Sequence, residues 1–502
     1  MPGLQSDGPA DRVLIKENIP NSAVKGLVDF LETHYLSPKV ETTEVTGYSK
    51  IGPGTNSNFD LYWKASYKRP GSAPEKPQHQ TVAVHAVLGP TGVTIEFPGL
   101  NPDDPQANQT AVRTSDLVEF MATSFLAKSK RTALYFISSP GEEKVMEAPR
   151  KSGENTLDGL LRRVFAGNSV NLFLLFLPLS FVLAFLLGDY ALPAILCLQA
   201  VVIFYSDKLV LGTARVKPDK DRPEVLIVRV ASTPSMVDGI LNTMDSIIRP
   251  IEQALGEAIP KGAAASPQTK GRIYQVLTNA GVACSQDDIE ITTRNPYRLV
   301  QTAAEKFHLA PPKIAISNTP MDNASATGVA PNRATMTITA GALEDLDDDE
   351  LTAVIGHELG HVKGRDPLIL FGVTSLLYLG GYYLWYPLLL YLGIFYFVIA
   401  FGITYLVGKF LETRADTLSA VVLGMPGALA SALTAIGFTQ LYSERYSRGV
   451  RLLEWFRFDP HPPIYFRIQR LARISSEGVS IRHAFLTSVK DCLSGFLVAF
   501  VP

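Results

Sequence analysis

Two histidines within residues 350–366 have a spacing that points to metal chemistry. His357-Glu358-Leu359-Gly360-His361 is an HExxH motif. Histidines four residues apart lie on one face of a helix, so both imidazoles can reach the same tetrahedral Zn²⁺ ion. Glu358 directly follows the first histidine, where a general base can accept a proton from water. The pattern predicts a catalytic zinc site, and the alternative is a helix with two surface histidines.

The sequence around the motif favours a helix that begins near residue 347. Asp347–Glu350 place negative charge at the expected N-terminal end, where the helix dipole favours it. The apolar residues that follow recur at helical spacing and predict a buried stripe, namely Leu351, Val354, Ile355 and Leu359. We therefore expect one face of this helix to be held against a core while the histidines line a site.

A catalytic zinc ion requires a third protein ligand and an open fourth position. The extended motif HExxHxxGxxH is excluded, because Pro367 occupies its last place and cannot bind a metal. A glutamate on a second helix is the remaining common solution, and Glu412 and Asp416 share a helix face there. We expect Glu412 to be the third ligand and Asp416 to accept a hydrogen bond from a ligand histidine. An ordinary acidic helix face is the alternative.

Composition indicates a membrane protein with large soluble parts. The 502 residues include 46 Lys and Arg and 48 Asp and Glu, so the net charge is −2 and gives no electrostatic argument for nucleic-acid binding. Four stretches contain no charged residue: 166–187, 190–206, 367–386 and 388–407. The three cysteines are widely separated, which excludes a disulfide framework and favours a reducing compartment.

The charge-free stretches predict two transmembrane hairpins, at 164–206 and 367–408, since about 20 helical residues span a bilayer. The second hairpin must return to the side it left if Glu412 is to meet the histidines. Basic residues flank both hairpins and are missing from their turns; they include Lys208, Lys217, Lys220, Lys363, Arg365, Lys409 and Arg414. The positive-inside rule then predicts a multi-pass protein of the cell membrane with both termini and the active site in the cytoplasm. A buried soluble hairpin is the alternative at 367–408.

The remaining segments read as soluble units. Residues 1–150 predict an N-terminal α+β domain, with a helix near Val24–Leu31, several alternating strands, and Thr132–Ile137 as the closing strand. Residues 209–366 and 409–502 would be the two parts of one peptidase domain, with strands at Lys313–Ser317 and Arg333–Thr339 in the first part. The role of residues 1–150 is not readable from the sequence.

The motifs together resemble those of HtpX-type membrane zinc metallopeptidases, a gluzincin branch related to the CaaX prenyl proteases. The resemblance covers about residues 296–470. The resemblance rests on five motifs: Pro311–Ile314, a turn at Asn323–Gly328 similar to an NAxATG motif, His357–Asp366, Glu412–Asp416, and His461-Pro462-Pro463 with Arg467. Ser325 departs from the family pattern, where an aromatic residue is usual.

The resemblance implies an α+β multi-domain integral membrane protein with four transmembrane helices. A mainly helical gluzincin domain would carry a small β-sheet and bind one Zn²⁺ through His357, His361 and Glu412. Glu358 would be the general base. His461 would stabilise the reaction intermediate or block the zinc ion, unless it is a structural residue in a Pro-rich turn.

We also expect substrate contacts at the NAxATG segment (Asn323, Ala324) and along Arg333–Thr339 (Thr335, Thr337). That strand would pair with an extended polypeptide if it lies at a sheet edge, and an interior strand is the alternative. The resemblance implies cleavage of misfolded or unassembled membrane proteins in quality control, with a homo-oligomer left open. The alternatives are a processing peptidase for signal-bearing or prenylated peptides, and a non-proteolytic sensor or adaptor with a structural zinc.

Overall fold

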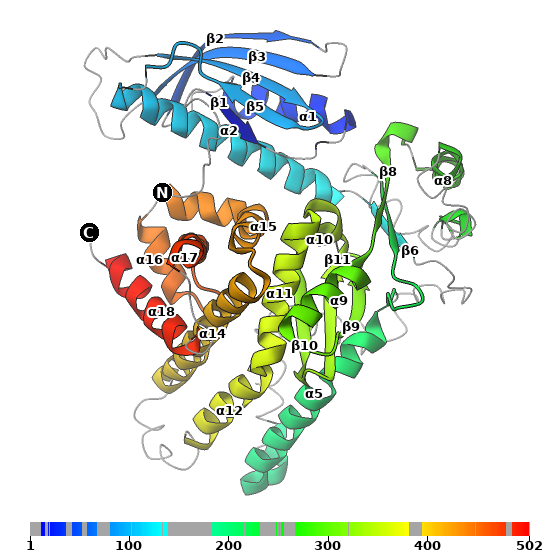
Figure 1. Ribbon diagram of the computed structural model, residues 1–502, viewed down its shortest axis with the longest axis vertical. Coiled ribbons are helices and arrows are strands. Elements are labelled where there is room, and N and C mark those ends of the chain that lie inside the picture. Colours follow the sequence, from blue (N-terminus) through cyan, green and yellow to red (C-terminus); the bar gives the residue numbers. More distant parts are fainter. Residues whose placement is uncertain are drawn as a thin grey trace.

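The chain forms a helical body with a sheet domain on one side and three apolar helices projecting from the opposite side (Figure 1). The computed structural model describes residues 12–15, 19, 21–36, 43–52, 58–67, 81–138, 182–230, 247–255, 267–380, 394–477 and 484–500, apart from one or two residues inside several of these ranges. All structural statements below concern these residues.

The N-terminal domain is an antiparallel sheet covered on one face by helices. Its strands, in the spatial order β1-β5-β4-β3-β2, are β1 (Arg12–Ile15), β5 (Gly92–Glu96), β4 (Val82–Gly89), β3 (Phe59–Tyr67) and β2 (Thr43–Ile51). The covering helices are α1 (Asn21–Leu31), the π-helix Glu32–Leu36 and α2 (Pro105–Thr132). Alternate residues of β4 point into the core beneath the helices, which explains the alternation in the sequence. Helix α2 also packs against α15 (Pro426–Tyr446) of the helical body.

The expected closing strand of this domain belongs to a different sheet. β6 (Leu134–Ser138) pairs antiparallel with β7 (Val225–Val230), which in turn pairs with β8 (Ile289–Arg294). β6 and β7 are separated by the segment predicted to contain the first membrane hairpin. That pairing is a non-local contact that alternation alone does not reveal, so the prediction of a closing strand was wrong. Helix α8 (Pro267–Asn279) packs against this second sheet.

A third sheet, of order β10-β11-β9, lies next to the HExxH helix. Its strands are β9 (Lys313–Ser317), β10 (Ala324–Ala330) and β11 (Arg333–Thr339). One expectation is corrected here, and one open alternative is decided. The segment Asn323–Gly328 is mostly strand rather than turn, and β11 lies in the interior of the sheet while β10 forms one edge. Gly328 has φ of 131° at an irregularity of β10, where a Cβ would meet the carbonyl of Arg333.

Helices make up the rest of the body. They are α9 (Pro296–Phe307), α10 (Ala340–Asp345), α11 (Asp348–Gly364), α14 (Ile394–Leu423), α15 (Pro426–Tyr446), α16 (Arg448–Phe456), α17 (Ile464–Glu477) and α18 (Ala484–Phe500). One hydrophobic core joins α9, α11, α14, α15 and the third sheet. α11 lies inside this core on one face, as its apolar spacing predicts.

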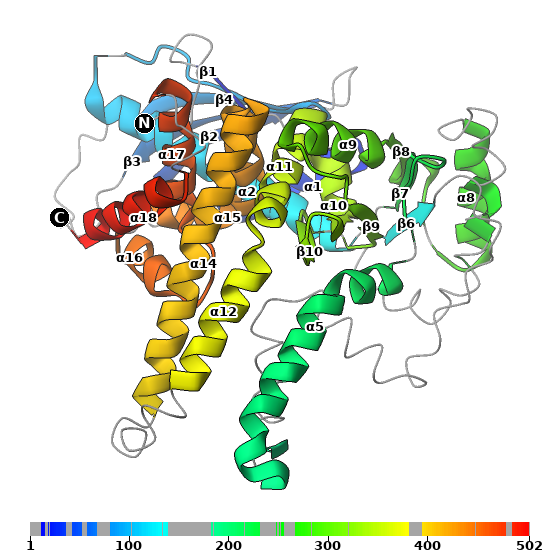
Figure 2. The same cartoon turned by 60° about the horizontal axis from the view of Figure 1, so that its bottom comes forward.

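The apolar helices α5 (Ala191–Thr213), α12 (Asp366–Leu379) and the first half of α14 extend together beyond the body (Figures 1 and 2). Ala191–Gly212 is long and apolar enough to cross a membrane; no other described helix meets both criteria, and Asp366–Leu377 is apolar but shorter. Four transmembrane helices are therefore not confirmed. Most of the expected helix at 164–187 and the turn at 381–393 lie outside the described residues.

Candidate metal centre

Helix α11 is defined at both ends by the sequence. At its start Asp347 and Glu350 form a capping box, in which each side chain accepts a hydrogen bond from the other residue's backbone N–H. At its end Arg365 has φ of 55°, a left-handed conformation that stops the helix, and Pro367 follows in the first turn of α12. Between these limits, His357 and His361 lie one turn apart.

Small residues allow α14 to approach α11 closely enough to bring a ligand from a second helix. A Cβ atom added to Gly360 would lie 3.0 Å from the Cα of Ala415, and one added to Gly356 would lie 2.8 Å from Ser419 Oγ. Ser419 Oγ donates a hydrogen bond to the carbonyl of Ala353 at 2.7 Å and ties the two helices together. This contact fixes the position of α14 along α11, and so places Glu412 opposite the two histidines.

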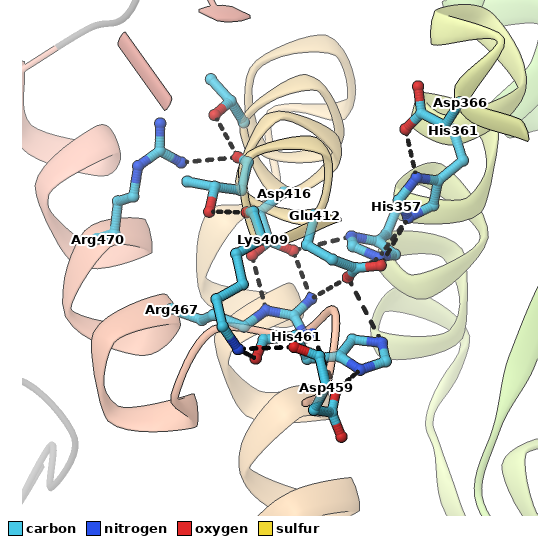
Figure 3. A network of polar contacts seen from close by, with 12 residues as sticks. His357, His361, Asp366, Lys409, Glu412, Asp416, Asp459, His461, Arg467 and Arg470 are labelled. Atoms are coloured by element: carbon cyan, nitrogen blue, oxygen red, sulfur yellow. Dashed lines mark hydrogen bonds and ion pairs between the residues drawn. The ribbon is translucent and has the colours of Figure 1, made fainter. Parts of the chain in front are cut away.

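Three candidate ligand atoms converge between the two helices (Figure 3). His357 Nε2 lies 3.2 Å from Glu412 Oε2, and His361 Nε2 lies 3.4 Å from Glu412 Oε1. The two Nε2 atoms are 3.1 Å apart. All three residues offer an atom within 4.8 Å of the others. The HExxH spacing and the return of the chain to Glu412 thus produce one compact N₂O donor set.

Carboxylates behind the histidines fix their tautomers. Asp416 Oδ1 lies 2.8 Å from His357 Nδ1, and Asp366 Oδ2 lies 2.7 Å from His361 Nδ1. We assign the proton to Nδ1 in both rings, since a carboxylate can only accept. In the neutral rings each Nε2 then carries a lone pair, and two lone pairs at this distance repel unless a cation, either a proton or a metal ion, lies between them. The donor set therefore fits a metal ion, and two imidazoles with one carboxylate suit Zn²⁺.

The charge around the donors also favours a cation. Burial by itself would lower the pKa of His357, but its contacts with Asp416 and Glu412 raise that pKa to about 9. Burial would likewise raise the pKa of Glu412, yet His461 and His361 hold it well below its ordinary value. Glu412 Oε2 is buried and makes no well-formed hydrogen bond within the described residues. The described part of the protein thus keeps a buried anionic oxygen without a hydrogen-bond donor of its own at the centre of the site.

Two arginines stabilise the supporting carboxylates. Arg467 on α17 binds Asp416 through two hydrogen bonds, of 2.8 and 2.7 Å, and Arg414 on α14 pairs with Asp366. A two-pronged guanidinium–carboxylate pair holds the acceptor rigidly as well as charged. The two histidines are therefore oriented by a buried network that extends from α17 to the start of α12.

Glu358 connects the site to the edge of the third sheet. Its Oε2 accepts a hydrogen bond of 2.7 Å from the backbone N–H of Ala326 on β10. Burial raises the pKa of Glu358, and the nearby histidines partly oppose this effect. A carboxylate held beside the donor set with a raised affinity for protons has the properties of a general base.

His461 lies on the other side of Glu412, in the loop between α16 and α17. Its Nε2 is 3.6 Å from Glu412 Oε2, and its Nδ1 is 2.7 Å from Asp459 Oδ1. The Glu412 carboxylate raises the pKa of His461 although burial opposes the effect. The side chain is 54% exposed, so the ring is accessible from solvent.

The expected substrate contacts divide into two groups. Asn323 lies at the start of β10, where its N–H donates to Thr339 Oγ1, and Ala324 follows it on the edge strand. Thr335 lies on the interior strand β11, is 1% exposed and donates through Oγ1 to the carbonyl of Asp207. Thr337 shares that strand. Of the two alternatives for Arg333–Thr339, the interior strand is confirmed, and both edges of β11 are already occupied, by β10 and β9.

Sequence reasoning missed several residues of the network. Asp366 has no expected role of its own within His357–Asp366, although a carboxylate five residues after His361 is a signal for a histidine partner. Lys409 and Arg414 are expected as flanking charges of the membrane hairpin, but they are only 2% and 9% exposed. A charged residue within a helix that is otherwise apolar is the signal that could have identified them as buried partners.

The fold and the site define a metalloprotease of the HExxH class in which a second helix supplies a glutamate. The sequence profile of peptidase family M48 matches residues 291–475. A protease HtpX homolog of Moorella thermoacetica is 30% identical over 217 residues, which is 36% of this chain and 72% of that protein. The homolog of Pyrococcus furiosus is 32% identical over 36% of this chain and 73% of its own length. The homolog of Tropheryma whipplei is 31% identical over 41% of this chain and 80% of its own length. The chain belongs to peptidase family M48, among the HtpX-like metalloproteases.

Proposed function

We propose that the protein is a zinc-dependent endopeptidase, inserted in the cell membrane, that hydrolyses peptide bonds of misfolded or unassembled proteins on the cytoplasmic side. The observation that carries this proposal is the position of Glu358, which lies beside a metal donor set and accepts an N–H from the edge strand β10. A structural zinc site needs ligands but no adjacent base and no open position. The arrangement therefore supports hydrolysis over a purely structural or adaptor role.

In the proposed reaction, His357, His361 and Glu412 hold the zinc ion. When bound, the ion supplies Lewis acidity toward the scissile carbonyl and toward water. Glu358 takes a proton from the attacking water as the oxygen–carbon bond forms, and passes it to the amine nitrogen as the carbon–nitrogen bond breaks. His461, held through Nδ1 by Asp459, would donate from Nε2 to the negative charge that develops on the carbonyl oxygen.

The position of β10 at one edge of its sheet supports an extended polypeptide as substrate. A strand added along this edge would run past Glu358 and would have to replace the bond between Glu358 and the Ala326 N–H. Backbone pairing reads little side-chain identity, which suits unfolded chains better than a single recognition sequence. The same edge would serve a processing peptidase, so the substrate class is decided by experiment.

Membrane insertion is supported by the projecting helices. Large apolar side chains are exposed along them, including Val201 and Phe204 on α5 and Ile399 and Ile403 on α14. In the part of the chain that the structure describes, Lys208, Lys217, Lys220, Lys363 and Arg365 are exposed at the base of these helices and support a cytoplasmic site. Cysteines introduced at residues 188 and 386 should then react with reagents only from outside.

The experiment compares wild type with Glu358→Gln and with Glu305→Gln, a change to an exposed glutamate of α9. We expect Glu358→Gln to bind zinc normally and to lose cleavage of an unfolded protein by about 10²- to 10⁴-fold. Glu305→Gln should cleave as wild type does. A protein that binds zinc but cleaves nothing would be an adaptor, and one that cleaves only signal-bearing or prenylated peptides would be a processing enzyme.

A further inference from the structure

Helices α16 and α18 carry large apolar side chains that remain exposed. On α16 and the loop after it, Leu453, Phe456 and Phe458 are 68%, 56% and 50% exposed. On α18, Leu486, Leu493, Leu497, Val498 and Phe500 are all more than 40% exposed. We call these eight residues the α16–α18 platform. A patch of this kind marks an interaction surface, since monomeric soluble proteins rarely leave such a group uncovered.

The platform is an ordered surface and not a frayed chain end. Phe456, Phe496 and Phe500 contact one another with ring centroids 4.9 to 5.9 Å apart, and Trp455 closes the cluster from beneath. α18 is anchored to α14 through Cys492, which is 1% exposed and lies 3.0 Å from Thr413. Leu486, Leu493 and Leu497 lie on the side of α18 away from Cys492, so this side faces outward.

The platform is continuous with the apolar part of α14. The ring of Phe458 lies 6.3 Å from that of Phe401 and 5.8 Å from that of Tyr405. Both belong to residues 394–407, which contain no charge and expose Phe395, Val398, Ile399, Ile403 and Leu406. α18 packs against both α14 and α16, and Figures 1 and 2 both show α18 against α14. Phe458 therefore shares the surroundings of this part of α14, so lipid that covers one also contacts the other.

We propose that α16 and α18 lie in the interface of the lipid bilayer as a second, non-spanning membrane contact. This inference rests on the proposed insertion of α5, α12 and α14. A helix that exposes apolar residues on one side and lies across the membrane normal suits the boundary between headgroups and acyl chains. Lys490 lies on the same face between Leu486 and Leu493, where its long stem lets the ammonium reach lipid phosphates.

The platform also connects the bilayer to the site. The chain runs directly from Phe458 through Asp459 to His461, and Gly408 of α14 allows that loop to pack close, since a Cβ there would lie 2.9 Å from Pro460 Cβ. Lipid contact at Phe458 is thus directly next to Asp459, the aspartate that holds His461.

The test uses full-length protein in phosphatidylcholine–phosphatidylglycerol vesicles with lipid-attached nitroxide quenchers. In a Cys197→Ala, Cys284→Ala background that keeps the buried Cys492, an environment-sensitive fluorophore is attached at Leu497→Cys or Leu453→Cys. Val201→Cys on α5 reports insertion, and Thr46→Cys on the N-terminal sheet reports water. All four positions are exposed or on the surface of their elements, so labelling should leave the fold intact.

We expect emission at Leu497→Cys and Leu453→Cys to shift to the blue and to be quenched several-fold more than at Thr46→Cys. Quenching at Val201→Cys without quenching at these two positions would overturn the inference and leave membrane insertion standing. A blue shift without lipid quenching would mean that protein covers the platform, a second copy included, and would also overturn it. No quenching at Val201→Cys would refute the insertion itself, and this inference with it.

Discussion

Lys409 Nζ donates hydrogen bonds to the backbone carbonyls of His461, at 2.9 Å, and of Asp459, at 2.7 Å. The ammonium therefore ties the His461 loop to α14 one helical turn before Glu412. Burial lowers the pKa of Lys409, while Asp459 opposes that effect. The lysine acts on the site through the loop and so is a positioning residue.

Replacing Lys409 with Met should misplace His461 and lower kcat by about 10- to 100-fold, because small displacements of catalytic groups cost rate steeply. Zinc content should stay at the wild-type level, since no ligand is touched. Lys409→Arg, which can still donate to both carbonyls, should recover part of the activity, and Lys313→Met on the surface should have no effect. Equal losses in the Met and Arg variants, with unchanged thermal unfolding, would contradict the positioning role.

Asp366→Asn should weaken zinc binding. The amide can no longer serve as an anionic acceptor for His361 Nδ1, and changes of this kind cost about 10- to 100-fold in metal affinity. Competition with a chromogenic chelator measures the loss directly. Asp349→Asn, in the exposed first turn of α11, is the matched control and should bind zinc as wild type does. Unchanged zinc affinity in Asp366→Asn would show that His361 is oriented by other contacts.

Gly360→Ala should separate α11 from α14. The new methyl group would lie 3.0 Å from the Cα of Ala415, and overpacking against backbone typically destabilises by about 1–3 kcal/mol. Denaturant unfolding should report that loss together with weaker zinc binding. Gly372→Ala on α12, whose Cβ would meet no described residue within 4 Å, should leave both quantities unchanged. If the two variants behave alike, the helix contact does not set the ligand distance.

Zinc added to metal-free protein should raise the temperature of thermal unfolding. The ion binds only the folded arrangement and stabilises it by about 2.7 kcal/mol when its concentration is one hundred times Kd. Glu412→Gln, which removes the anionic ligand, should respond much less to the same zinc concentration. Calorimetry of both proteins with and without a chelator makes the comparison, and an identical zinc response would remove Glu412 from the ligand set.

The parts of the site that depend on helical periodicity within one segment were predictable from the sequence. The helical spacing of His357 and His361 places them together, and the return of a charge-free hairpin places Glu412 beside them. The order of strands was not predictable, because pairing is a non-local property: β6 finds its partner β7 some 90 residues later in the chain. β10 was not predicted as a strand because three of its seven residues are Ala and one is Gly, and both residue types are depleted in strands.

The candidate ligands stand on both sides of the apolar hairpin, with two in α11 and one in α14. During synthesis, the histidines leave the ribosome about fifty residues before the glutamate does. A nascent chain thus lacks a complete donor set until α14 has been synthesised and has packed against α11. Metal binding by all three side chains, and any peptidase activity that depends on it, is in this way tied to completed folding of both helices.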